Sequence, residues 1–158
     1  MTRPADQSAL ARHFREHSRH WRTFDYVYPV ISRRSRGLSI GVNLNPDMAC
    51  NFDCIYCCVD RTQPPRRRDV DLEQLTGELD QLLAAAADDR IWLDPAFADV
   101  PEDYRRINDI AFSGDGEPTL YPGIDDACRL AADVRDAHGL SDVKLLLLTN
   151  ATLLDRDH

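Results

Sequence analysis

The sequence predicts an α/β fold in which parallel strands are joined by helical crossovers. Three observations lead to this prediction. Strand-like and helix-like segments alternate in the order strand, helix, strand, helix, strand between residues 37 and 150. The last of these strands, 143–150, contains the apolar run "LLLL", which is typical of strands buried in parallel sheets. Each strand is followed at once by a loop that carries Cys, Glu or Asn.

The first part of the chain is expected to be a basic extension, residues 1–36, ahead of the α/β domain. Residues 8–21 have helical potential and a polar character. His13, His17 and His20 share one face of such a helix and could bind a metal, but an exposed polar face is the simpler expectation. The first strand, 37–45, ends at Pro46, and the basic, proline-broken loop 62–68 follows the cysteines.

The first crossover helix is predicted over residues 71–87. Asp71 is a plausible N-cap, and Gln74 three residues later completes a capping-box pattern. The connection 88–106 is irregular, and its aromatic residues Trp92, Phe97 and Tyr104 indicate that it packs down. One helical stripe carries all the leucines of this helix: Leu72, Leu75, Leu79, Leu82 and Leu83.

The second strand, 107–113, stops at the turn "GDGEP", and the second helix, 122–139, is closed by Gly139. Cys128 is expected on the inner face of that helix as a small buried hydrophobe. Residues 151–158 look like the beginning of a third helix. We therefore expect residues 37–158 to be the front half of a larger domain, either part of a longer protein or truncated. The inner face of the second helix is expected to contain Ile124, Cys128, Ala131 and Val134.

Composition narrows the class of protein. The chain has 158 residues, of which 43% are hydrophobic and 29% charged, as in soluble globular domains. Neither a signal peptide nor a membrane span of roughly 18 apolar residues is recognisable. A cytoplasmic location is therefore expected, and in that reducing compartment clustered cysteines favour metal binding or catalysis over disulfides.

The net charge of −8 is unevenly distributed. Residues 1–68 contain 12 Lys and Arg against 6 Asp and Glu, whereas residues 69–158 contain 7 against 21. The basic N-terminal segment, residues 1–68, could bind the phosphates of RNA or of a nucleotide. A solvated charged surface is the ordinary alternative.

Four of the five cysteines lie in "CNFDCIYCC", residues 50–58. Cys50, Cys54 and Cys57 have the spacing C-x3-C-x2-C, so three thiolates could bind three irons of a [4Fe–4S] cluster and leave the fourth iron open. A structural zinc site more often uses two C-x2-C pairs, and an electron carrier needs a fourth ligand. A zinc-stapled binding module and a ferredoxin-like carrier both remain alternatives. Cys58 is not expected to join the same site.

The cysteine motif, with Tyr56 before the third cysteine, resembles that of radical S-adenosylmethionine (radical SAM) proteins. The segments "AFSGDGEPTLYP" and "LLLLTN" agree with the iron–sulfur oxidoreductase branch, which includes wyosine-tRNA-synthase-like and uncharacterised members. The resemblance covers about residues 27–154. It implies a partial (β/α) TIM barrel, here the first three β/α units, whose ligands collect at the carboxyl ends of the strands.

The resemblance also implies roles for particular residues. Cys50, Cys54 and Cys57 would hold the cluster, and Gly116 and Glu117 would contact the methionine amino group of S-adenosylmethionine. Tyr56 would contact adenine through its backbone, and Asn150 ends the third strand as in many members. Asp115 stands where the motif often has its first glycine.

The implied activity is reductive cleavage of S-adenosylmethionine to a 5′-deoxyadenosyl radical that removes hydrogen from a substrate. It needs a low-potential electron donor, flavodoxin or ferredoxin. Modified tRNA is a conceivable substrate by family analogy and because of the basic N-terminal segment.

Overall fold

The computed structural model describes residues 4–15, 21–65 and 67–155. Its centre is a four-stranded mixed sheet in the spatial order β1–β2–β3–β4. β2, β3 and β4 are parallel, whereas β1 pairs antiparallel with β2. The α/β class is therefore confirmed. The strands are β1 (Val27–Ser32), β2 (Gly37–Val42), β3 (Ile107–Phe112) and β4 (Lys144–Leu147).

The antiparallel strand β1 corrects the prediction that every strand is parallel. Its residues fall inside the segment 1–36 that was expected to be an extension, yet Val27 to Ser32 pair in register with Val42 to Gly37. Pro29 lies in the middle of β1 and cannot donate a backbone hydrogen bond, which argues against a central strand. In this sheet β1 is an edge strand, where a proline is tolerated.

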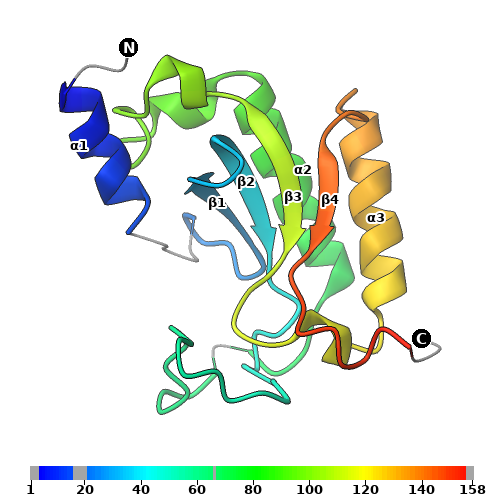
Figure 1. Ribbon diagram of the computed structural model, residues 1–158. Coiled ribbons are helices and arrows are strands. Elements are labelled where there is room, and N and C mark those ends of the chain that lie inside the picture. The colour runs from blue at the N-terminus through cyan, green and yellow to red at the C-terminus, as the bar shows by residue number, and fades with distance from the viewer. Residues whose placement is uncertain (1–3, 16–20, 66, 156–158) are drawn as a thin grey trace.

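Three helices accompany the sheet: α1 (Pro4–His13), α2 (Leu72–Ala87) and α3 (Ile124–Ala137). α2 and α3 lie next to each other on one side of the sheet, and α1 lies on the far side of the molecule from α3 (Figure 1). The parallel strands point toward the end of the molecule where the loops after β2, β3 and β4 gather. We call this end, formed by residues 43–62, 113–123 and 148–155, the rim.

The leucine stripe of α2 builds the core as predicted. Leu75, Leu79, Leu82 and Leu83 are fully buried, in one cluster with Ile110 of β3. Burial of one such side chain contributes about 1.5–3 kcal/mol. Leu72 is only partly buried against this cluster.

The predicted helix ends are confirmed in most respects. Asp71 caps α2 by accepting hydrogen bonds from the backbone N–H groups of Glu73 and Gln74. The predicted return contact of the capping box, from the Gln74 side chain to the Asp71 backbone, was wrong. The Gln74 amide donates to the carboxylates of Asp25 and Glu78 instead. Gly139 follows α3 with a φ of 68°, the left-handed conformation that favours glycine at this position.

The connection 88–106 packs down, as expected. It contains two short 3-10 helices, Arg90–Leu93 and Glu102–Tyr104, and Trp92 and Tyr104 are buried. His13 of α1 also packs against this segment: it is 7% exposed, stacks on Phe97 and lies 2.9 Å from the Asp99 carboxylate. The expectation that His13 is exposed was wrong, and His17 and His20 lie outside the described residues.

The third predicted strand, residues 143–150, is more exposed than its apolar sequence led us to expect. β4 is parallel to β3 as predicted, but its exposed side chains include Leu146 and Leu147, each 38% exposed. No further strand covers it within the part of the chain that the structure describes. Residues 151–155 form turns, not the helix that was expected to begin there, and residues 156–158 lie outside the described residues. Cys128 is half-buried against the core, and burial raises the pKa of its thiol.

Candidate functional site

The cysteine loop follows β2 directly and contains no helix or strand over its described residues from 43 to 70. Cys50 and Cys54 are half-buried, whereas Cys57 and Cys58 are exposed. The loop also presents apolar side chains to solvent, with Ile55 fully exposed and Tyr56 80% exposed. All four thiols are therefore available at the rim.

The thiols of the loop have polar neighbours. The Cys54 thiol hydrogen-bonds with the Tyr56 hydroxyl, and this bond raises the pKa of Tyr56. The Arg61 guanidinium lies 3.2 Å from Cys57 Sγ, and this contact raises the pKa of Arg61. A cation at this distance favours the thiolate form of a cysteine, the form that binds metals. Cys58 instead contacts the Tyr56 carbonyl oxygen at 3.7 Å.

The "GDGEP" turn after β3 packs against the residue that precedes the first cysteine. The Glu117 backbone N–H donates to the Ala49 carbonyl oxygen at 3.0 Å. A Cβ atom on Gly116 would lie 1.9 Å from that same oxygen and 2.7 Å from Asn45 Cβ. Only glycine permits this approach, so Gly116 brings the turn and the cysteine loop together.

The Glu117 carboxylate joins the ends of β3 and β4. It is 4% exposed, and its Oε1 accepts from the Thr119 backbone N–H, the Thr119 hydroxyl and the Thr149 hydroxyl. Its Oε2 accepts from the Asn150 backbone N–H at 2.8 Å. An ionised carboxylate offers about four acceptor positions. The expected contact with an amino group would therefore have to use the remaining position on Oε2.

These bonds also determine the charge of Glu117. Burial alone would raise the pKa of this carboxyl group. The hydrogen bonds from Asn150, Thr119 and Thr149 outweigh burial and hold the pKa of Glu117 below its ordinary value. The group is therefore a carboxylate at neutral pH.

Asp115, which departs from the motif, has a defined partner. Asn43 is 4% exposed at the end of β2, and its amide nitrogen donates to the Asp115 carboxylate at 2.7 Å. Asn43 Oδ1 accepts from the backbone N–H groups of Asn45 and Asp115. One buried side chain thus ties the turn after β3 to the strand that leads into the cysteine loop.

Asn150 connects the third motif to the first. Its amide nitrogen donates to Asn51 Oδ1 at 2.8 Å, and the Asn51 amide donates to the Thr152 hydroxyl at 2.8 Å. Asn51 lies between Cys50 and Cys54 in the chain. The three predicted motifs are therefore linked to one another by hydrogen bonds at the rim.

Sequence reasoning missed Asn43, Asn51 and Thr149, which make these links. Polar amides at the end of an apolar strand, in "IGVNLNP", were the available signal for Asn43. Asn51 and Thr149 had no comparable signal, because their partners are distant in sequence: Asn150 and Glu117.

The donor chemistry of the cysteine loop suits an iron–sulfur cluster. Three cysteines that form no disulfide lie on one loop, Arg61 contacts one of them, and the described residues of that loop form no helix or strand. In the described ranges, no three His, Cys, Asp or Glu side chains are already gathered as a metal site requires. Binding of a cluster would therefore require the loop to bring the three thiols closer together.

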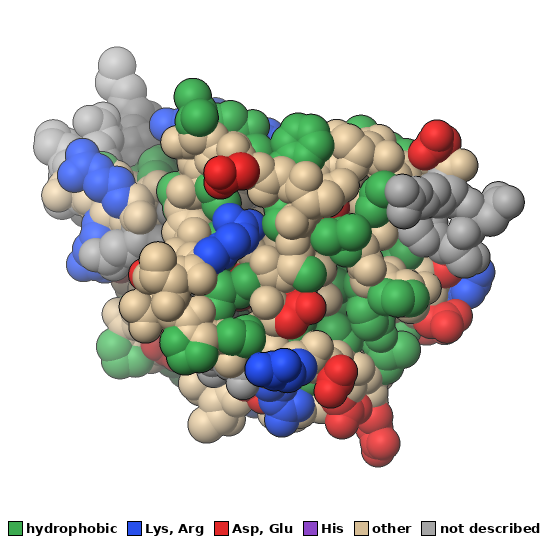
Figure 2. Space-filling model, turned by 90° about the horizontal axis from the view of Figure 1, so that it is seen from below, with side chains coloured by type: hydrophobic (Ala, Val, Ile, Leu, Met, Phe, Trp, Pro, Cys, Tyr) green, Lys and Arg blue, Asp and Glu red, His purple; other side chains and the backbone are tan. Residues whose placement is uncertain are grey.

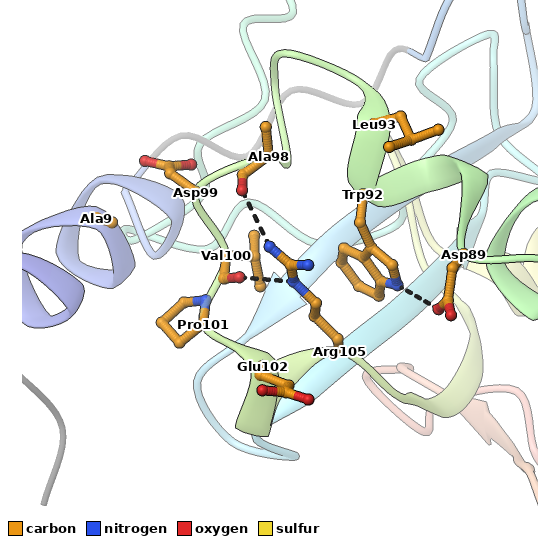
Figure 3. Close-up of a pocket in the computed structure, with 10 residues that line it drawn as sticks. All are labelled: Ala9, Asp89, Trp92, Leu93, Ala98, Asp99, Val100, Pro101, Glu102 and Arg105. Atoms are coloured by element: carbon orange, nitrogen blue, oxygen red, sulfur yellow. Dashed lines mark hydrogen bonds between the residues drawn. The ribbon is translucent and has the colours of Figure 1, made fainter.

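A hollow of about 820 Å³ lies away from these motifs. Figure 3 shows that it is formed by Ala9 of α1 and the connection 88–106, with Trp92 and Arg105 at its centre. Arg105 donates to the carbonyl oxygens of Ala98 and Val100, and the Trp92 indole donates to Asp89. The polar groups of Trp92 and Arg105 thus stabilise the connection 88–106 itself, and we assign them no role in ligand binding.

The rim surface has a mixed character. Figure 2 views the molecule from this end and shows Lys or Arg, hydrophobic and acidic side chains interspersed over the face. None of the described helices is long and apolar enough to cross a membrane.

Comparison with known proteins finds relatives at 26–30% sequence identity. The chain is 30% identical to a UPF0026 protein of Helicobacter pylori over 128 residues. This match covers 79% of the chain and 34% of that protein. It is 28% identical over 132 residues to a UPF0026 protein of Methanocaldococcus jannaschii, covering 82% of the chain and 34% of that protein. The GTPase Obg of Brachyspira hyodysenteriae is 26% identical over 129 residues, 80% of the chain and 15% of that protein.

The chain spans about a third of the length of the UPF0026 proteins that it matches. No protein-family model matches the sequence, and no solved structure matches it. The chain is therefore similar to part of the UPF0026 proteins.

Proposed function

We propose that the rim holds a [4Fe–4S] cluster on Cys50, Cys54 and Cys57 and binds S-adenosylmethionine beside it, as in radical SAM proteins. One observation carries the proposal. The three motifs that the resemblance selects are hydrogen-bonded to one another, through Glu117 to Ala49 and through Asn150 to Asn51. These contacts support the proposal, because a cluster and a cosubstrate bound side by side would need the three motifs to be neighbours.

The bound cluster, reduced by flavodoxin or ferredoxin, would supply the electron that cleaves S-adenosylmethionine into methionine and a 5′-deoxyadenosyl radical, which takes hydrogen from the substrate. The protein supplies position and charge. Arg61 contacts the Cys57 thiol, where a cation favours the thiolate form, and Gly116 lets the Ala49 carbonyl oxygen, beside the first cysteine, approach the turn after β3. Glu117 links the loops after β3 and β4 by hydrogen bonds, and one acceptor position of its carboxylate is left for an ammonium group. Tyr56 would contact adenine through its backbone, and Asn150 would complete the site at the end of β4.

The activity of the whole protein, its electron donor and its cytoplasmic location are part of the same proposal. Modified tRNA is proposed as substrate by family analogy and because residues 1–68 have an excess of positive charge. GTP hydrolysis, the activity in the name of one relative, has no support in this sequence. A phosphate-binding loop of the pattern G-x-x-x-x-G-K-[ST] does not occur in it.

The test is anaerobic reconstitution of the chain with iron and sulfide, followed by iron analysis and electron paramagnetic resonance of the reduced protein. We expect about four irons per chain, as a [4Fe–4S] cluster requires. The signal should change when S-adenosylmethionine is added. Cys50→Ala, Cys54→Ala and Cys57→Ala should each lose the cluster, whereas the matched control Cys58→Ala should keep it.

Other results would support the alternatives. One zinc per chain and no cluster would indicate a zinc-stapled module. A cluster that is lost in Cys58→Ala and whose signal ignores S-adenosylmethionine would indicate a ferredoxin-like carrier.

A further inference from the structure

The face of the sheet opposite α2 and α3 carries a groove of about 660 Å³ that extends from the β1–β2 turn, residues 33–36, to the rim. Alternate residues of the strands line it, including Tyr28 of β1, Gly41 of β2 and Ala111 of β3. The Tyr28 ring lies so close to Gly41 that a Cβ there would meet it at 2.2 Å. Tyr28 thus forms part of the wall, and the polar groups near the turn end of the groove remain to be explained.

Asp109 is the first of these groups. It is 4% exposed, lines the groove, and accepts a hydrogen bond from the hydroxyl of Ser39, its partner in the β2–β3 register. Among the described residues it has no ion-pair partner. A buried carboxylate without a cation costs several kcal/mol. The wall of a cavity is a place where a ligand can supply the missing positive charge.

The β1–β2 turn provides the second set. Ser35 Oγ is buried and has no hydrogen-bond partner among the described residues. Arg33 and Arg34 are exposed at the same end of the groove, and neither has an ion-pair partner within the described ranges. Two guanidinium groups and a free hydroxyl are a donor set suited to an oxyanion.

We infer that this end of the groove binds a small molecule with an oxyanion at one end and an ammonium or amidinium group at the other. The oxyanion lies at Arg33, Arg34 and Ser35, and the nitrogen cation lies at Asp109 and Ser39. The turn that carries Arg33, Arg34 and Ser35 leads into Gly37, the first residue of β2. Ser39 lies two residues further along this strand, which corresponds to about 7 Å. The two charged ends of the ligand are therefore separated by about that distance.

The site is distinct from the rim. β3 extends three residues beyond Asp109, to Phe112, which corresponds to about 10 Å of strand, and the rim end of the groove is lined by Cys58, Gly114 and Gly116. The inference thus does not depend on the proposed cluster, and it stands or falls on binding alone.

The test compares two probes that differ only in the amine: 4-aminobutyl phosphate and butyl phosphate. Their affinities for the intact chain are measured by titration calorimetry in a phosphate-free buffer at constant ionic strength. A hydrogen bond to a charged group contributes about 1.5–3 kcal/mol, so the amine should strengthen binding about ten- to hundredfold. Equal affinities, or no binding of either probe, would overturn the inference.

Two variants assign the ends. In Asp109→Asn the shape of the side chain is retained but its charge is lost, and the preference for the amine should disappear. In the double variant Arg33→Gln and Arg34→Gln, which changes exposed residues only, both probes should bind about tenfold more weakly. Circular dichroism checks that each variant is folded. A preference for the amine that persists in folded Asp109→Asn would also overturn the inference, as would unchanged binding in the arginine variant.

Discussion

Glu117 illustrates how one buried carboxylate can organise a site. Four hydrogen bonds from Thr119, Thr149 and Asn150 converge on it, from two segments that follow different strands. The sequence pattern marked Glu117 as a ligand for an amino group. The structure adds a second role, because the same carboxylate links the loops that follow β3 and β4.

The first prediction concerns Glu117→Gln. The amide NH₂ of glutamine cannot accept from the donors that now surround the carboxylate, so the unfolding free energy at pH 7 should fall by about 1–3 kcal/mol. The pKa of Glu117 is lowered in the folded chain, so its contribution is present above its ordinary pKa of about 4.3 and is lost as the pH falls through the lowered value. Urea unfolding at pH 7, 5 and 3 should therefore show a difference between wild type and variant that shrinks toward acid. A difference that is constant over this range would contradict the role of charge.

Gly116 leads to the second prediction. A Cβ atom at this position would lie 1.9 Å from the Ala49 carbonyl oxygen, which is backbone and cannot turn aside. Gly116→Ala should therefore separate the turn from the cysteine loop, lower the melting temperature and abolish cluster assembly. The matched control is Gly77→Ala in α2, where nothing lies within 4 Å of the new Cβ. This control should raise stability by about 0.5–1 kcal/mol, because alanine is the better helix former. Equal melting temperatures for the two variants would argue against the close approach at Gly116.

At the scale of elements, α2 holds the beginning of β1 through a single side chain. Glu78 is 4% exposed, and its carboxylate accepts from the backbone N–H groups of Asp25, Tyr26 and Val27. These N–H groups lie where the chain enters the antiparallel edge strand. The direction of β1 is thus supported by a contact to a helix more than 50 residues away.

The third prediction follows from this contact. Glu78→Ala leaves buried N–H groups without an acceptor, at about 1–3 kcal/mol each, and should destabilise the chain by at least about 3 kcal/mol. Glu73→Ala, an exposed change in the first turn of the same helix, should cost less than about 1 kcal/mol. Chemical unfolding monitored by circular dichroism measures both. Similar losses for the two variants would show that the contact between Glu78 and β1 is not needed for stability.

At the scale of the whole molecule, β4 forms one edge of the sheet. Leu146, Leu147 and Leu148 are 38–45% exposed, and the outer side of β4 has no strand partner among the described residues. An exposed apolar edge strand is a template for pairing with another chain. This edge is the feature of the fold that departs most from an ordinary protein surface.

The fourth prediction is that the isolated chain self-associates through this edge. Leu147→Lys places a charge on β4, as natural edge strands often do, and should shift the chain toward monomer without loss of helix content. Sedimentation velocity at several concentrations measures the association. Leu93→Lys, which changes another exposed leucine in the connection 88–106, serves as the control. A wild-type chain that is monomeric at all concentrations, or equal effects of the two variants, would contradict the prediction.

The order of the parallel strands and their helices could be predicted from the amino-acid sequence, and so could the grouping of the three motifs at one rim. Periodicity and capping are local properties, so the leucine stripe and the Asp71 cap of α2 could be read directly. The shared rim follows from the parallel direction of β2, β3 and β4, because their carboxyl ends meet at one edge of the sheet.

Other features of the fold and the site depend on contacts between distant parts of the chain. The antiparallel pairing of β1, the burial of His13 and the exposure of β4 depend on neighbours that no local pattern reveals. The hydrogen bond from Thr149 to Glu117 and the one from Asn150 to Asn51 join residues 32 and 99 positions apart. Such contacts arise because folding brings distant donors and acceptors together, and a buried polar group must find its partner wherever the fold provides one.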